Sequence, residues 1–182
     1  MRARSGFNGL LKAVLSCALT CALARPETAD EGQLKAAFLY HFTKFVEWPA
    51  ESSALPADDT ISVCTLGNDT LRSALDESLR DKKVRNHSLV IKHLKNSQQA
   101  SSCNVLFVSN SESKKLTDIL ENAASGNVLT VGDSPGFTKR GGCIEFIVDS
   151  NRIHFVVNLA AARKAGLRIS SELLSLADSV EK

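Results

Sequence analysis

The chain has 182 residues, 43% of them hydrophobic and 23% charged, and its net charge at pH 7 is only +2. This length and apolar content are enough for a buried core and unlike those of a disordered chain. A net charge so close to zero argues against a nucleic-acid-binding protein. The densest basic stretch, residues 80–85, is interrupted by an acid, has no neighbouring aromatic residue and is typical of a solvated helix end.

The first 24 residues have the layout of a secretory signal peptide. Three basic residues and no acid precede a small, apolar run over residues 13–23, and an A-x-A cleavage motif ends at Ala24. The run is too short to span a bilayer. We therefore expect residues 1–24 to be removed and residues 25–182 to form one exported domain in the periplasm.

An alternative for the N-terminus is a lipid anchor. Val14-Leu15-Ser16-Cys17 loosely resembles a lipoprotein cleavage box, although Val14 and Leu15 stand where the box prefers Leu and a small residue. The mature chain would then be a lipoprotein anchored through Cys17. Beyond the signal no apolar run approaches the length of a membrane span, so we expect no stable membrane insertion of the mature chain.

The mature region opens with an amphipathic helix that carries five of the ten aromatic residues. Side chains of its apolar face recur at helical spacing, at Leu34, Ala37, Phe38, His41, Phe42 and Phe45. Pro49 ends this helix near Trp48. We interpret the aromatic stripe as core, with a ligand cage as the alternative. A polar loop follows over residues 50–59.

Strands and helices then alternate along the chain. Strands are predicted at residues 61–66, 89–91, 105–108 and 128–131, and helices at 69–79, capped by Asp69, and at 116–124. Repeated strand–helix units of this length predict a mainly parallel sheet flanked by helices. Right-handed crossovers place the first of these strands centrally, with the second and third on either side of it.

The end of the chain differs in character. Residues 144–148 and 153–157 flank a turn at 149–151 and predict an antiparallel hairpin added to the sheet. Short helices capped by Asn158 and by Ser170 follow. The expected fold is therefore α/β, a layered domain with a mainly parallel sheet, flanking helices and a C-terminal antiparallel hairpin.

No enzymatic motif is present. The sequence lacks a G-x-S-x-G elbow, a P-loop, an H-E-x-x-H helix and a paired C-x-x-C. The four histidines, His41, His87, His93 and His154, are far apart without ligand spacing, and we interpret them as packed or surface residues. We accordingly expect no catalytic residue, no metal and no cofactor.

Small-molecule binding is the alternative function. In a parallel sheet, ligands bind at the carboxyl ends of the strands, which here places candidate site loops at Gly67, Ser109 and Asp133. The turn after the first strand also opens a helix, whose amides are suited to an anion. This reading makes the chain a periplasmic small-molecule-binding module of another signalling or transport system.

Three cysteines remain after the signal is removed. Cys64 lies inside the first strand and Cys103 at the start of the third, and these strands are expected to be neighbours. A bridge would close a loop of about 40 residues, worth about 4 kcal/mol in the chain-entropy model. Export favours this disulfide over two buried free thiols. Cys143 is then left unpaired within the chain. It is expected to be a buried thiol, a reactive thiol or one half of a disulfide between two chains.

Two stretches resemble YfiR-like proteins. Residues 38–49, Phe-Leu-Tyr-His-Phe-Thr-Lys-Phe-Val-Glu-Trp-Pro, are similar to the opening helix of that family. Gly142-Cys143-Ile144-Glu145-Phe146 and the stretch from Arg152 through Leu173 resemble its second signature. The resemblance extends from about Gln33 to Ala177.

The resemblance has implications for the cysteines. Cys64 and Cys103 match the long-range disulfide pair of the family, while Cys143 matches one half of a short-range pair. The other half falls at Gly136, so a redox mechanism that needs two bridges is not expected to operate here.

The resemblance also implies a function. It indicates a periplasmic repressor that binds the periplasmic sensor region of an inner-membrane diguanylate cyclase and holds that enzyme inactive. Cyclic di-GMP synthesis and biofilm formation would then fall. A homodimer remains open on this reading.

Overall fold

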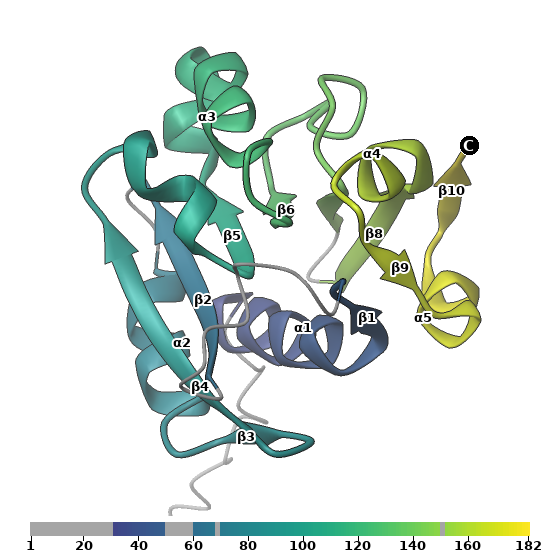
Figure 1. The fold of residues 1–182 in the computed structure, drawn as a ribbon. Coiled ribbons are helices and arrows are strands. Elements are labelled where there is room, and N and C mark those ends of the chain that lie inside the picture. Colours follow the sequence, from purple (N-terminus) through teal and green to yellow (C-terminus); the bar gives the residue numbers. More distant parts are fainter. Residues whose placement is uncertain (1–30, 50–59, 68–69, 150–151) are drawn as a thin grey trace, which may run out of the picture.

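The computed structural model describes residues 31–49, 60–67, 70–149 and 152–182 (Figure 1). The expected signal peptide, the Asp69 cap, the polar loop at 50–59 and the centre of the hairpin turn lie outside these ranges. Within the described ranges, no helix combines the length and the apolar character needed to cross a bilayer.

An eight-stranded sheet forms the centre of the described residues, in the order β10-β8-β7-β6-β5-β2-β4-β3. Its strands are β2 (Thr60–Leu66), β3 (Lys83–Val84), β4 (His87–Leu94), β5 (Val105–Val108), β6 (Leu129–Gly132), β7 (Ile144–Asp149), β8 (Arg152–Asn158) and β10 (Ser179–Glu181). Strands β4, β2, β5, β6 and β7 run parallel, and β7–β8 is an antiparallel hairpin. The expected α/β class and the central place of the first predicted strand are both confirmed.

Helices cover both faces of this sheet. One face carries α1 (Glu31–Phe45) and α2 (Leu71–Ser78), and the other carries α3 (Leu116–Ala123) with the 3-10 helices η1 (Ser97–Ser102) and η2 (Asn110–Lys115). Successive residues of a strand point to opposite faces, so Val63 belongs to the core under α1 and Cys64 to the core under α3. Burial on both faces accounts for the apolar run of β5 and for the continuous burial of residues 61–66 in β2.

Helix α1 joins the start of the described chain to its C-terminal hairpin. Phe42 is fully buried, and its ring centroid lies 5.2 Å from that of Phe155 and 5.7 Å from that of Phe146. Phe38, half-buried, adds an edge contact to Phe155 at 5.7 Å. Phe45 is likewise half-buried and packs against the same core. The aromatic stripe of α1 is therefore part of the core.

One difference from the predicted elements lies at the end of the first helix. Helix α1 ends at Phe45 instead of near Trp48, because β1 (Val46–Glu47) pairs antiparallel with β9 (Arg168–Ile169). The carbonyl of Phe45 accepts a hydrogen bond from the amide of Ser170 at 3.0 Å. This tertiary pairing ends the helix before the turn that Pro49 enforces.

The two C-terminal helices, α4 (Leu159–Lys164) and α5 (Ser171–Leu176), begin as predicted. The Asn158 side chain accepts a hydrogen bond from the amide of Ala161 at 2.8 Å, and the Ser170 hydroxyl accepts one from the amide of Leu173 at 3.2 Å. Both are N-caps that satisfy amides at the helix start. After α5, strand β10 returns to the sheet and pairs parallel with β8.

Replacement of Phe42 by alanine tests the aromatic core. Phe42→Ala removes a fully buried ring and should lower the free energy of unfolding by about 3–5 kcal/mol, measured by urea denaturation. Gln33→Ala, at an exposed position of the same helix, is the matched control and should change stability by less than about 0.5 kcal/mol. Wild-type stability with lost regulation in Phe42→Ala would instead identify the stripe as a binding surface.

Candidate functional site

The three predicted site loops meet at the carboxyl edge of the parallel strands. Gly67 follows β2, Ser109 follows β5 and Asp133 follows β6. The amide of Ser109 donates to the carbonyl of Leu66 at 3.0 Å, and Asp133 Oδ1 accepts from the amide of Asn110 at 2.7 Å. The structure thus brings together loops that are far apart in the sequence.

Gly67 is required at this edge. Its φ of +104° lies in the left-handed region, and a Cβ there would come within 2.8 Å of the Ser109 Cβ and 2.7 Å of the Ser111 Oγ. A larger residue would therefore strain the backbone and separate the two loops.

A buried ion pair occupies the same edge, and the sequence reasoning missed its cationic member. Lys35 of α1 donates from Nζ to Asp133 Oδ2 at 2.6 Å and contacts Glu31 Oε1 at 2.7 Å. The Lys35 side chain is 3% exposed and that of Asp133 is 12% exposed. The available signal was helical register, because Lys35 lies four residues before buried Leu39 and so on the buried face of α1.

The Lys35–Asp133 pair lies at the same edge as the three loops. Neither the cavity of about 480 Å³ nor the cavity of about 210 Å³ among the described residues is lined by Gly67, Ser109 or Asp133. The pair attaches α1 to the end of β6. Ligand binding at these three loops remains a prediction.

A disulfide joins Cys64 to Cys103, and the two Cα atoms are 6.0 Å apart. Both residues are fully buried in the core under α3. Beside the bridge, the amide of Asn104 donates to the carbonyl of Ser62 at 3.0 Å, and the amide of Ser62 donates to Asn104 Oδ1 at 2.8 Å. The bridge and these hydrogen bonds together fix the segment that enters β5 against β2.

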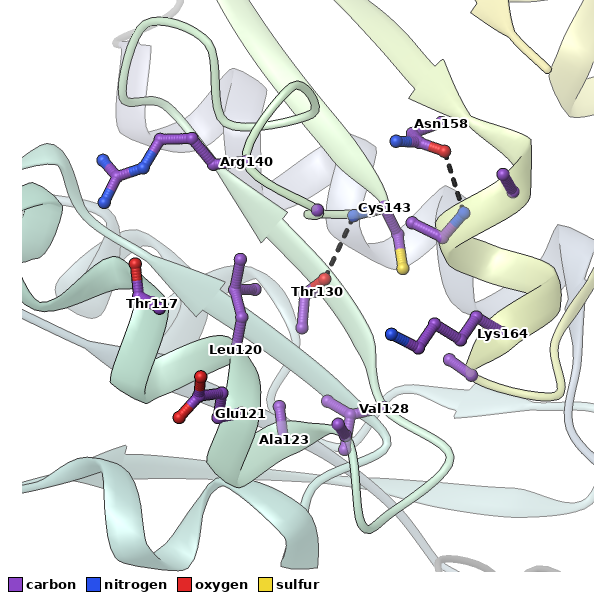
Figure 2. A pocket seen from close by; sticks show the side chains of 15 residues that line it. Thr117, Leu120, Glu121, Ala123, Val128, Thr130, Arg140, Cys143, Asn158 and Lys164 are labelled. Atoms are coloured by element: carbon purple, nitrogen blue, oxygen red, sulfur yellow. Dashed lines mark hydrogen bonds between the residues drawn. The ribbon is translucent and has the colours of Figure 1, made fainter.

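Cys143 is a free thiol that is 2% exposed. Burial raises the pKa of this thiol, and hydrogen bonding with Thr130 only partly opposes the shift. The amide of Cys143 donates to Thr130 Oγ1 at 3.0 Å. At neutral pH the group is therefore a neutral thiol and a slow nucleophile. Its side chain lines the larger cavity (Figure 2).

The described histidines make structural contacts. His93 Nδ1 lies 2.8 Å from Thr65 Oγ1, and its Nε2 lies 3.0 Å from Asp76 Oδ2. This arrangement has the composition of a hydrolase triad, but Thr65 is 1% exposed and cannot meet a substrate. The contacts connect β2 and β4 to α2. Among the residues that the structure describes, no group of three or more His, Cys, Asp or Glu is arranged to hold a metal ion.

Two solved structures share the fold. A conserved domain protein from Vibrio cholerae O1 biovar El Tor matches with a TM-score of 0.58 and 15% identity over 80% of this chain. The ABC domain in complex with L-Trp from Streptococcus pneumoniae matches with a TM-score of 0.53 and 10% identity over 82% of this chain. This chain covers 60% of the length of each. Comparison with curated proteins finds no match.

The mainly parallel sheet, with helices on both faces and a closing antiparallel hairpin, places the protein among α/β domains. A family model described as YfiR/HmsC-like matches residues 32–178, and the chain belongs to that family. The family is one of periplasmic regulators of cyclic di-GMP signalling and not of catalysts.

Reduction of the disulfide should destabilise the fold. Loss of a bridge that closes this loop should lower the free energy of unfolding by about 4 kcal/mol, measured by denaturant titration with and without a reductant. Cys143→Ala is the control and should leave the effect of the reductant unchanged. A peptide map without reductant that joins Cys143 to Cys64 or Cys103 would contradict the assigned pairing.

Removal of one partner of the buried ion pair should also be costly. Asp133→Asn removes the buried carboxylate partner of Lys35 but keeps its contact with Glu31, and it should lower stability by about 2–3 kcal/mol, less than for complete loss of a buried pair. The double variant Lys35→Met with Asp133→Asn should recover most of this loss. Additive effects of the two single variants in thermal unfolding would show that the pair is not coupled.

Proposed function

We propose that this protein binds the periplasmic sensor region of an inner-membrane diguanylate cyclase and holds the enzyme inactive. The observation that carries the proposal is the YfiR/HmsC-like match over residues 32–178. In this role the protein lowers cyclic di-GMP synthesis and biofilm formation by contact, without chemistry of its own. Export by a cleaved signal at residues 1–24 is part of the proposal, with a lipoprotein anchored through Cys17 as the alternative.

Features of the described residues support a role in contact over one in catalysis. The Thr65–His93–Asp76 arrangement is closed to substrate, and the Cys143 thiol is buried and its pKa raised. The sheet is instead stabilised by a packed core on each face. Such a rigid domain suits a protein that must present a constant surface to a partner.

The disulfide gives this function a link to redox conditions. Because Cys64–Cys103 stabilises the folded state, its reduction increases the unfolded population that periplasmic proteases degrade. Repression should therefore weaken through loss of protein. The single described bridge is sufficient for such a response, and Gly136, where the family pattern has a cysteine, offers Cys143 no disulfide partner.

Deletion of the gene tests the proposal. A repressor that acts by contact should, when lost, raise cyclic di-GMP and surface attachment, and only in a strain that retains the partner cyclase. Both quantities can be measured in matched strains with and without that cyclase. Complementation with Cys143→Ala should restore repression, whereas Cys64→Ser with Cys103→Ser should restore it poorly. Unchanged cyclic di-GMP, together with tight binding of a metabolite by the purified protein, would favour the small-molecule-binding module.

A further inference from the structure

The sheet opens between β6 and β7. These strands are in register only at Val131↔Ile144 and Gly132↔Glu145, so the start of β6 has no ladder partner in β7. At that point the amide of Cys143 donates to Thr130 Oγ1 at 3.0 Å, and the Cys143 carbonyl accepts from the amide of Asn158 at 2.8 Å. Thr130 and Cys143 line the floor of a cleft of about 480 Å³ between α3 and α4.

Small side chains keep this cleft open. Both helical walls present alanines to it, namely Ala123 and Ala124 at the end of α3 and Ala160, Ala161 and Ala165 at α4. Leu120 and Val128 add apolar surface. Because these side chains end at a methyl group, neither helix fills the space between them. The cleft volume of about 480 Å³ lies within the range of small-ligand sites.

The charges at the cleft are unevenly placed. Figure 2 shows the ammonium of Lys164 directed into the cleft from α4, with the Cys143 sulfur pointing to the same space. The carboxylate of Glu121 lies on the α3 wall. Arg140 contributes less, because its Nη1 donates to the carbonyl of Ser113 at 2.9 Å and its guanidinium points away from Lys164 in the same view.

We propose that this cleft binds a small organic monoanion with an apolar body, whose negative group pairs with Lys164 and whose body packs on the alanines above Cys143. Glu121 on the facing wall disfavours a second negative charge. The neutral thiol of Cys143 behaves at the floor as a small apolar group. The site is separate from the three loops at the carboxyl edge. It goes beyond the proposed repressor function and does not rest on it.

Three probes of one shape and different charge test the proposal on the purified, disulfide-bonded protein. Isothermal titration with 2-naphthoate, 2-naphthamide and 2-naphthylmethylamine should give the tightest binding for the anion, about fivefold over the neutral amide. Lys164→Met should abolish this preference, and Glu121→Gln should strengthen naphthoate binding. Lys139→Met changes an exposed lysine that does not line the cleft and is the matched control, which should bind like wild type.

Cys143 reports whether the probe occupies this cleft. Naphthoate should slow modification of the thiol by methyl methanethiosulfonate. Ala161→Leu should fill the cleft and remove both binding and protection, and Ala124→Leu blocks it from the other wall should the first variant fail to fold. Equal binding of all three probes, wild-type preference in Lys164→Met, or binding that leaves Cys143 unprotected would overturn the proposal. Since no cyclase is present in these measurements, their failure is distinguishable from a failure of repression.

Discussion

Helix α1 packs its aromatic face against the C-terminal hairpin, and the rest of the fold depends on this contact. Phe42 of α1 packs its ring against Phe146 of β7 and Phe155 of β8. The free energy gained by burying a ring of this size is about 1.5–3 kcal/mol, before the aromatic pairing is counted. About two turns toward the N-terminus, Lys35 anchors the same helix to Asp133. The helix thereby fixes the sheet from its centre to the hairpin.

The opposite face of the sheet is stabilised differently. Its core consists mainly of Leu, Val and Ala side chains, with Phe137 the aromatic ring among its described buried members. The Cys64–Cys103 bridge lies in the middle of this smaller core. A covalent link that restricts the unfolded chain compensates for the lower apolar mass there. The core under α1 is therefore sensitive to substitution of its aromatic residues, whereas the core under α3 is sensitive to reduction of the disulfide.

Much of the fold could be predicted from the sequence because its main elements carry strong local signals. The β-branched and apolar residues of β2 and β5 and the polar caps Asn158 and Ser170 are such signals. Strands β1, β9 and β10 were missed because two or three residues are too few to show a period, and their pairing is decided by tertiary contacts.

The candidate sites were harder to predict. The three carboxyl-edge loops follow from strand direction, but the Lys35–Asp133 pair joins residues 98 positions apart and depends on how α1 lies over the sheet. The cleft beside Cys143 arises from a strand register, which no local pattern encodes. Prediction therefore worked for features that follow from local pattern and strand direction, and it failed for contacts that depend on how helices and very short strands pack.

The position of the disulfide in the chain permits early covalent linkage of two central strands. A polypeptide that emerges N-terminus first presents Cys64 and Cys103 well before Phe146 and Phe155 appear. Strands β2 and β5 can therefore be linked covalently while α1 still lacks its aromatic partners on the hairpin. The bond then lowers the entropic cost of forming the remaining long-range contacts, because part of the loop-closure entropy has already been removed. In an oxidising compartment, the bridge can therefore form before the C-terminal hairpin is available to join the sheet.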